Sequence, residues 1–108
     1  MWVKRGTSSA NTAQTITVPA QLNRAHKILG FEVYIYAADA GNDITIELRE
    51  NTTTLYKTII GSGAPRGERV GLIFPKPLYA GVNAPVSLFI GGGGTGCVTE
   101  ANIMGKTE

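Results

Sequence analysis

The sequence predicts an all-β protein, an antiparallel sandwich or small barrel of about seven or eight short strands. Three observations favour this fold class. Apolar and polar residues alternate with a period of two in several segments, as they do in half-buried strands. Fourteen glycines and five prolines divide the chain into short pieces. No segment of helical periodicity separates the strands, which disfavours a parallel sheet.

The clearest strands lie in the first half of the chain. Residues 14–18 alternate polar and apolar side chains and stop at Pro19. After a turn or loop at 20–27, residues 28–38 are rich in β-branched and aromatic residues. Residues 43–50 show the most regular alternation. The residues predicted to point inward are Phe31, Val33, Ile35, Ile44, Ile46 and Leu48.

Shorter strands are predicted in the second half, separated by glycine- and proline-rich turns. A strand at 55–60 follows a polar break, and 61–67 forms a loop. The next strand points Val70, Leu72 and Phe74 inward and ends before Pro75. A strand at 86–90 precedes the glycine run, and the last strand runs from Cys97 to about Met104.

A length of 108 residues predicts a single domain. Residues 1–12 are mostly small, polar and aperiodic, which indicates an N-terminal arm, and residues 13–108 are expected to form the sandwich. Trp2 is unusual in such a segment. Either it anchors the arm to a partner, or residues 2–4 add an edge strand to the protein's own sheet.

Composition narrows the function classes. Hydrophobic residues make up 43% and charged residues 17%, which argues against a disordered chain. The net charge of +2 gives no concentrated basic face, so no nucleic-acid partner is expected. One cysteine and one histidine exclude an internal disulfide and disfavour a zinc site. The longest apolar stretch, 31–38, is too short to cross a membrane, and no secretory leader is seen, so synthesis in a reducing cytosol is expected.

No catalytic, cofactor-binding or metal-binding residue is predicted, because each candidate motif lacks its required context. Residues 91–96 fit the G-x-G-x-x-G pattern, but a strand rather than a helix follows, so a flexible hairpin turn is the better interpretation. His26 has no evident nucleophile and is interpreted as a surface or loop residue. Cys97 is interpreted as a small core residue. Four carboxylates are considered as a hydrolytic pair: Glu32, Glu47, Glu50 and Glu100. Glu32 and Glu47 lie at outward strand positions, where solvated polar side chains are usual, so a catalytic pair is not expected.

A tyrosine-rich face suggests self-association. Tyr34 and Tyr36 project opposite Phe31, and with Tyr56, Ile28 and Ile60 they are expected to form an apolar patch. Such a patch favours aggregation on a monomer but is expected in a subunit interface. The alternative is that sheet and loops bury both faces of the strand.

The order of features from about residue 27 to 104 resembles the small β-sandwich structural proteins of tailed bacteriophages, especially capsid cement or decoration proteins. The segments that carry this resemblance are 28–34, 43–52, 77–82 and 85–90 with its glycine-rich turn. The resemblance implies a jelly-roll-like sandwich, often trimeric, without catalytic residues.

Together with these observations, the resemblance implies a non-enzymatic virion protein that is made in the host cytoplasm, binds the outer capsid surface and stabilises capsomer joints. Its partners would be the major capsid protein and two further copies of itself. The arm residues Trp2, Val3, Lys4 and Arg5 are the predicted capsid contacts, and Tyr34, Tyr36 and Tyr56 the self-association contacts. The alternative is a tail-fibre or tailspike module that recognises a cell-surface glycan through exposed Tyr and Trp and the loop residues Asp39, Asn42 and Asn83.

Overall fold

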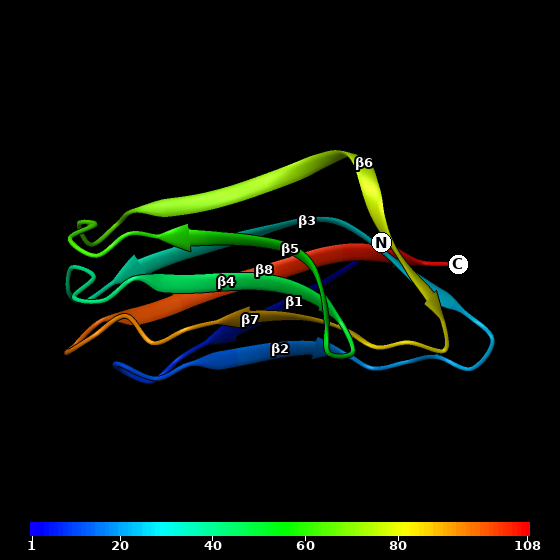
Figure 1. Ribbon diagram of the computed structural model, residues 1–108, viewed down its shortest axis with the longest axis horizontal. Helices are drawn as coiled ribbons and strands as arrows, with labels where there is room; N and C mark the ends of the chain where they lie inside the picture. The colour runs from blue at the N-terminus through cyan, green and yellow to red at the C-terminus, as the bar shows by residue number, and fades with distance from the viewer.

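The computed structural model describes residues 1–108 as eight β-strands without a helix, which confirms the predicted all-β class. The strands form two antiparallel four-stranded sheets packed as a sandwich that measures 42 × 25 × 21 Å (Figure 1). The strands are β1 (Trp2–Thr7), β2 (Gln14–Val18), β3 (Ala25–Tyr36), β4 (Ile44–Glu50), β5 (Thr53–Ile60), β6 (Arg69–Val82), β7 (Val86–Ile90) and β8 (Val98–Thr107). No helix is present that has the length and hydrophobicity needed to cross a membrane.

The connectivity is that of a jelly roll. The first sheet has the order β1-β8-β3-β6 and the second has the order β2-β7-β4-β5. The first four strands therefore pair with the last four in reverse order, as β1·β8, β2·β7, β3·β6 and β4·β5. The chain is thus one long antiparallel hairpin rolled into two layers, the arrangement known from viral capsid and lectin domains.

The core lies between the two sheets and is built by the predicted alternation. Ile44, Ile46 and Leu48 of β4 are fully buried, and so are Val86, Leu88 and Ile90 of the neighbouring β7. The first sheet contributes Phe31, Val33 and Ile35 from the opposite layer. Burial of each such side chain stabilises the fold by about 1.5–3 kcal/mol before the entropy cost of ordering the chain.

A β-bulge in β3 reverses the expected orientation of Ile28. Ile28 pairs with Gly105 and Gly30 pairs with Met104, so Leu29 is an extra residue without a partner on β8. The extra residue shifts the alternation by one position. The sequence pattern predicted Ile28 on the outer face with Tyr34. This prediction is wrong, because Ile28 is fully buried in the core.

Strand β6 is longer than predicted because it lies at the edge of its sheet. The prediction that this strand ends before Pro75 is wrong: β6 continues through Pro75 and Pro77 to Val82. An edge strand tolerates proline because one side of its backbone needs no ladder partner. The register with β3 jumps from Ile73 to Leu78, and Figure 1 shows the sharp bend of β6 in this region.

Residues 2–7 belong to the sandwich and do not form a separate arm. They pair with β8 as the edge strand β1, from Trp2 opposite Gly105 to Thr7 opposite Glu100. Trp2 packs against the core, and its indole Nε1–H donates a hydrogen bond to Thr107 Oγ1 at 3.0 Å. The alternative interpretation of Trp2, an added edge strand, is therefore the one that the structure supports.

His26 is buried within the sandwich, so its assignment to the surface is wrong. Its side chain is 1% exposed and lies edge-on to Trp2, with ring centroids 5.9 Å apart. His26 Nε2–H donates to the carbonyl oxygen of Pro19 at 2.8 Å, since that oxygen can only accept. Nδ1 lies 2.9 Å from Thr107 Oγ1. The histidine thus joins the β2–β3 loop to β8.

The glycine run connects the two sheets and is not a flexible hairpin turn. Gly93 and Gly94 are buried, the Gly93 carbonyl accepts a hydrogen bond from Gly41 N–H, and Gly94 N–H donates to Asn11 Oδ1 at 3.0 Å. A Cβ atom on Gly93 would lie 2.5 Å from Cys97 Sγ. The glycines are needed because the loop packs closely against its neighbours.

Candidate functional site

The outer face of the first sheet carries polar side chains in two adjacent rows. The register places Arg5 of β1 opposite Asn102 of β8, and Asn102 opposite Glu32 of β3. The next row contains Glu100 of β8 opposite Tyr34 of β3. These residues alternate with the buried Val33 and Ile103, so the same pleat that builds the core also directs these polar groups outward.

The two rows enclose a shallow pocket of about 180 Å³, which we call the outer pocket. Gly71 of β6 lies opposite Glu32 of β3. Because glycine has no side chain, Gly71 does not cover Glu32 on that side of the pocket. The lining residues are Arg5, Glu32, Tyr34, Glu100, Ala101 and Asn102.

Tyr34 and Glu100 form the central hydrogen bond of the outer pocket. The Tyr34 hydroxyl donates to Glu100 Oε2 at 2.7 Å. This bond raises the pKa of Tyr34, and partial desolvation adds to the effect. Arg69 of β6 lies beside the pair, 3.7 Å from Glu32 Oε2 and 5.9 Å from the centre of the Tyr34 ring. The pocket and its border thus combine two carboxylates with two guanidinium groups.

Asn102 has an unsatisfied polar atom. Its Oδ1 is buried and has no hydrogen-bond partner, and it is the one side-chain atom of the protein in this state. Buried polar groups are normally paired, so an exception requires an explanation. Asn102 was not among the predicted site residues, because its neighbours Arg5 and Glu32 are distant in the chain and leave no local pattern around it.

The three tyrosines predicted for self-association do not share a surface. Tyr34 and Tyr36 lie side by side on the outer face, with ring centroids 5.9 Å apart. Tyr56 instead packs between the sheets, where its ring lies 5.5 Å from Phe74 and 5.8 Å from Phe31. The prediction that Tyr34, Tyr36 and Tyr56 form one surface patch is therefore wrong.

The predicted capsid-contact residues are divided in a similar way. Trp2 is partly buried and hydrogen bonded within the fold, so it is not a free anchor. Val3, Lys4 and Arg5 are exposed along β1, and Arg5 lines the outer pocket. Only these three remain available to a partner.

The loop residues considered for glycan recognition lie at opposite ends of the sandwich. Asp39 and Asn42 belong to the β3–β4 connection and Asn83 to the β6–β7 connection. Two of them already have backbone partners, since Asp39 Oδ1 accepts from Arg66 N–H and Asn83 Oδ1 accepts from Asn23 N–H. These three residues cannot form one binding site.

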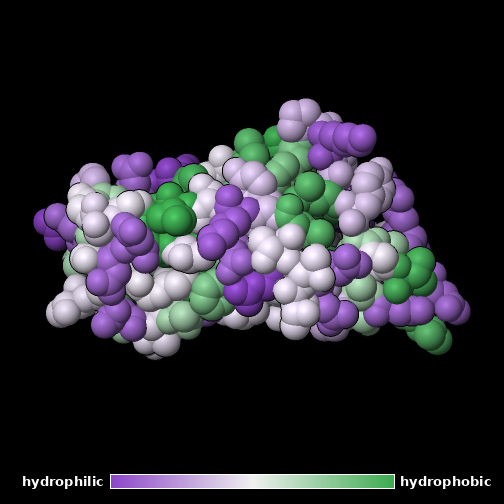
Figure 2. Space-filling model, in the orientation of Figure 1, coloured by the Kyte–Doolittle hydropathy of each residue, from purple (hydrophilic) through white to green (hydrophobic).

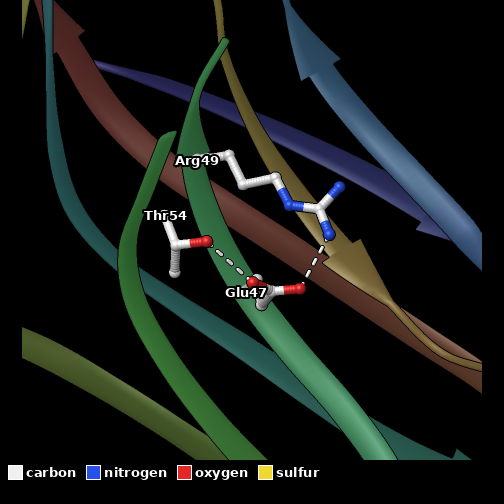
Figure 3. Close-up of polar contacts among 3 residues, drawn as sticks. All are labelled: Glu47, Arg49 and Thr54. Carbon is white, nitrogen blue, oxygen red and sulfur yellow. Dashed lines mark hydrogen bonds and ion pairs between the residues drawn. The ribbon is translucent and has the colours of Figure 1, made fainter. Parts of the chain in front are cut away.

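A second polar cluster lies on the outer face of the second sheet. Glu47 accepts hydrogen bonds from Arg49 at 2.7 Å and from the Thr54 hydroxyl at 2.8 Å (Figure 3). These two bonds lower the pKa of Glu47, the larger effect coming from Arg49. The Arg49 guanidinium also lies 4.5 Å from the centre of the Phe89 ring. All members of this cluster have partners within the protein, which indicates a structural role.

The candidate carboxylates are separated by the fold. Glu32 and Glu100 line the outer pocket, whereas Glu47 and Glu50 belong to β4 in the other sheet. Cys97 is buried, and burial raises the pKa of its thiol. No group of three or more His, Cys, Asp or Glu side chains is arranged to hold a metal ion.

The edge strands β5 and β6 lie along one side of the sandwich and carry most of its exposed large apolar side chains, and we call this pair of strands the β5/β6 edge. Both strands are edge strands of their sheets. Nine large apolar residues of the protein are exposed, and five of them belong to this edge: Ile59, Leu72, Ile73, Tyr79 and Val82. Figure 2 shows apolar side chains gathered over β5 and β6 at the upper margin of the molecule. Exposed apolar edge strands favour contact with another chain.

No protein-family model matches the chain, and comparisons with curated proteins and with solved structures gave no match.

Proposed function

We propose that the protein is a non-enzymatic decoration protein of a tailed bacteriophage, which binds the outer surface of the capsid and stabilises the joints between capsomers. The β5/β6 edge is the observation that carries this proposal. Four of its exposed apolar residues lie on one strand, β6, and Ile73 is 64% exposed. A surface of this kind gains stability when a neighbouring subunit covers it.

Two further observations support a structural role. The jelly-roll connectivity is one that viral capsid domains use. The loops between β1–β2, β3–β4, β5–β6 and β7–β8 are joined by hydrogen bonds, among them Asn11 N–H to the Cys97 carbonyl and Ala40 N–H to the Ala64 carbonyl, each at 2.9 Å. A rigid module of this type adds buried area at each joint, and many copies multiply a modest interface.

The proposal includes the oligomer and the contact residues. The β5/β6 edge, rather than a tyrosine patch, makes the contact between three copies around a threefold axis. The exposed side chains Val3, Lys4 and Arg5 of β1 face the major capsid protein on the other side of the sandwich.

The experiment compares shells with and without the protein. Undecorated shells are mixed with the wild-type protein, with Ile73→Lys or with Leu22→Lys, which places the same charge at an exposed apolar residue outside the β5/β6 edge. We expect the wild type and Leu22→Lys to raise the temperature at which shells rupture, and Ile73→Lys to raise it less. Equal rupture temperatures with and without the wild-type protein would contradict the proposed function.

A further inference from the structure

We propose that His26 is a pH-sensitive latch for strand β1: neutral His26 holds the Trp2 end of β1 on the sandwich, and protonation of His26 releases it. His26 is the only histidine of the chain, and its side chain is 1% exposed. The latch is a property of the single chain, so it goes beyond the decoration role and does not depend on it.

The hydrogen bonds around His26 define its tautomer. The Pro19 carbonyl oxygen can only accept, so His26 Nε2 carries the hydrogen. Nδ1 of a neutral imidazole is then an acceptor, and the Thr107 hydroxyl donates to it at 2.9 Å. Thr107 Oγ1 in turn accepts from Trp2 Nε1–H at 3.0 Å. All donors therefore point the same way, from Trp2 through Thr107 and His26 to Pro19.

This chain of hydrogen bonds is complete only while His26 is neutral. In the protonated ring both nitrogens are donors, so Nδ1 no longer accepts from the Thr107 hydroxyl. The hydroxyl hydrogen then has no acceptor, because the structure gives Thr107 Oγ1 no third partner. A polar hydrogen without a partner inside the protein is unfavourable, and so is a buried charge that no opposite charge compensates.

The charged groups around His26 do not supply that compensation. β2 and β7 contain no charged residue. The Glu108 carboxylate is already paired with Lys27 Nζ at 2.7 Å, and Glu50 of β4 accepts from the N–H of Gly81. The other titratable groups at this end of the sandwich are the amino group of Met1 and the side chains of Lys4, Arg24, Lys76, Tyr79 and Lys106. Most of these groups are cations, which oppose a further positive charge.

Strand β1 is the element that protonation of His26 releases. It lies at the edge of its sheet and is paired with β8 alone. Trp2 is its only large side chain that packs against the core, and the Trp2 ring lies edge-on to the imidazole. The other end of β1 is held independently, since Ser8 N–H donates to the Thr99 carbonyl and Thr99 N–H donates to Ser8 Oγ, each at 2.9 Å. The strand should therefore open from its Trp2 end.

The size of the effect follows from proton linkage. A histidine in contact with water becomes charged below about pH 6.5. Because the closed state holds His26 neutral and the open state lets it bind a proton, attachment of β1 is strongest at neutral pH and weakens as the pH falls. Opening should be about tenfold more frequent at about pH 5.5 than at about pH 7.5.

The test is hydrogen exchange of the full chain, followed by NMR at about pH 7.5 and about pH 5.5. The single tryptophan gives one indole N–H signal and the single histidine one imidazole ring. We expect protection of the Trp2 indole and of the β1 amides to fall about tenfold, while protection of the β4 amides falls by less than about twofold. The imidazole nitrogen shifts at neutral pH should show the hydrogen on Nε2.

Three variants separate the latch from a general effect of acid. His26→Gln keeps a donor and an acceptor but binds no proton in this range, so its β1 protection should be equal at both pH values. Thr107→Val breaks the connection, so β1 protection should already be low at neutral pH and change little in acid. Thr7→Val removes an exposed hydroxyl of β1 and should behave as the wild type does. The wild type and Thr107→Val decide the question even where His26→Gln does not fold.

Four results would overturn the proposal. The wild type shows the same β1 protection at both pH values; β1 and β4 lose protection by the same factor, which would mean that acid loosens the whole sandwich; Thr107→Val keeps the pH dependence of the wild type; or the imidazole carries its hydrogen on Nδ1 at neutral pH.

Discussion

The indole of Trp2 and the hydroxyl of Thr107 are joined by a hydrogen bond of 3.0 Å, although the two residues are 105 positions apart in the chain. The same Thr107 oxygen lies 2.9 Å from His26 Nδ1. Strands β1, β3 and β8 are therefore connected at one point by three side chains in addition to their backbone ladders.

Replacement of Thr107 by valine should destabilise the protein by about 1–3 kcal/mol, because Trp2 Nε1–H and His26 Nδ1 both lose their partner. The free energy of unfolding is measured in urea, with fluorescence of the single tryptophan as the probe. Thr7→Val removes an exposed hydroxyl of β1 and should change stability by less than about 0.5 kcal/mol. Equal values for the two variants would show that the Trp2–Thr107–His26 contact contributes nothing.

Gly105 provides the space that Trp2 occupies. A Cβ atom at Gly105 would overlap the Trp2 ring and would lie 2.5 Å from the backbone oxygen of Lys27. Gly105→Ala should therefore destabilise the fold by about 1–3 kcal/mol through overpacking. Gly61→Ala is the matched control, since nothing lies within 4 Å of its Cβ position. A melting temperature of Gly105→Ala as high as that of Gly61→Ala would contradict this packing.

The sequence predicted the elements whose pattern is local. The period-two alternation of β4 gave the orientation of Ile44, Ile46 and Leu48 correctly, because successive side chains of any strand point to opposite faces. The positions of the glycines and prolines likewise predicted where most of the turns lie. The predicted length of β6 failed, because the tolerance of Pro75 depends on the edge position of that strand, which is a property of the whole sheet.

The parts that failed depend on pairing between distant strands. The bulge at Leu29 exists only relative to the ladder with β8, so the burial of Ile28 could not be read from the alternation of β3 alone. The outer pocket has the same origin. Arg5, Glu32 and Asn102 become neighbours only through the β1·β8 and β3·β8 registers. A single sequence contains no local signal for such contacts.

The Glu47 cluster should make stability depend on pH in the acid range. The pKa of Glu47 is lowered in the folded state from 4.5, so the unfolded state binds more protons there. The stability that ionised Glu47 contributes is complete above the pKa that Glu47 has in the unfolded chain. It is lost as the pH falls through the lower pKa that Glu47 has in the folded protein. Glu47→Gln should therefore lose less stability than the wild type between about pH 5 and pH 3.

Thermal unfolding at several pH values measures this effect. Glu68→Gln serves as the control, because Glu68 lies on the exposed β5–β6 loop and forms no ion pair. Its acid profile should follow that of the wild type. Parallel acid profiles for Glu47→Gln and the wild type would contradict the role of the Arg49 and Thr54 contacts.

Cys97 should be unreactive in the folded protein. Its side chain is 1% exposed, burial raises the pKa of the thiol, and the charge of Asp39 raises it further. Since the thiolate is the reactive form, native Cys97 should react with a disulfide reagent at least about tenfold more slowly than the chain in denaturant. The release of the coloured thiol product measures both rates. Equal rates would mean that the thiol is accessible.

The β5/β6 edge should control association of the protein in solution. Ile73 is 64% exposed and Val82 is 61% exposed, so Ile73→Lys and Val82→Lys should change the stability of the monomer by less than about 0.5 kcal/mol. Each lysine places a charge in the proposed subunit contact, and an unpaired charge there opposes burial. Sedimentation equilibrium should therefore show a trimer for the wild type and for Leu22→Lys, and a shift toward the monomer for both edge variants. A wild-type protein that stays monomeric at all concentrations, or edge variants that associate as strongly as the wild type, would exclude this edge as the subunit interface.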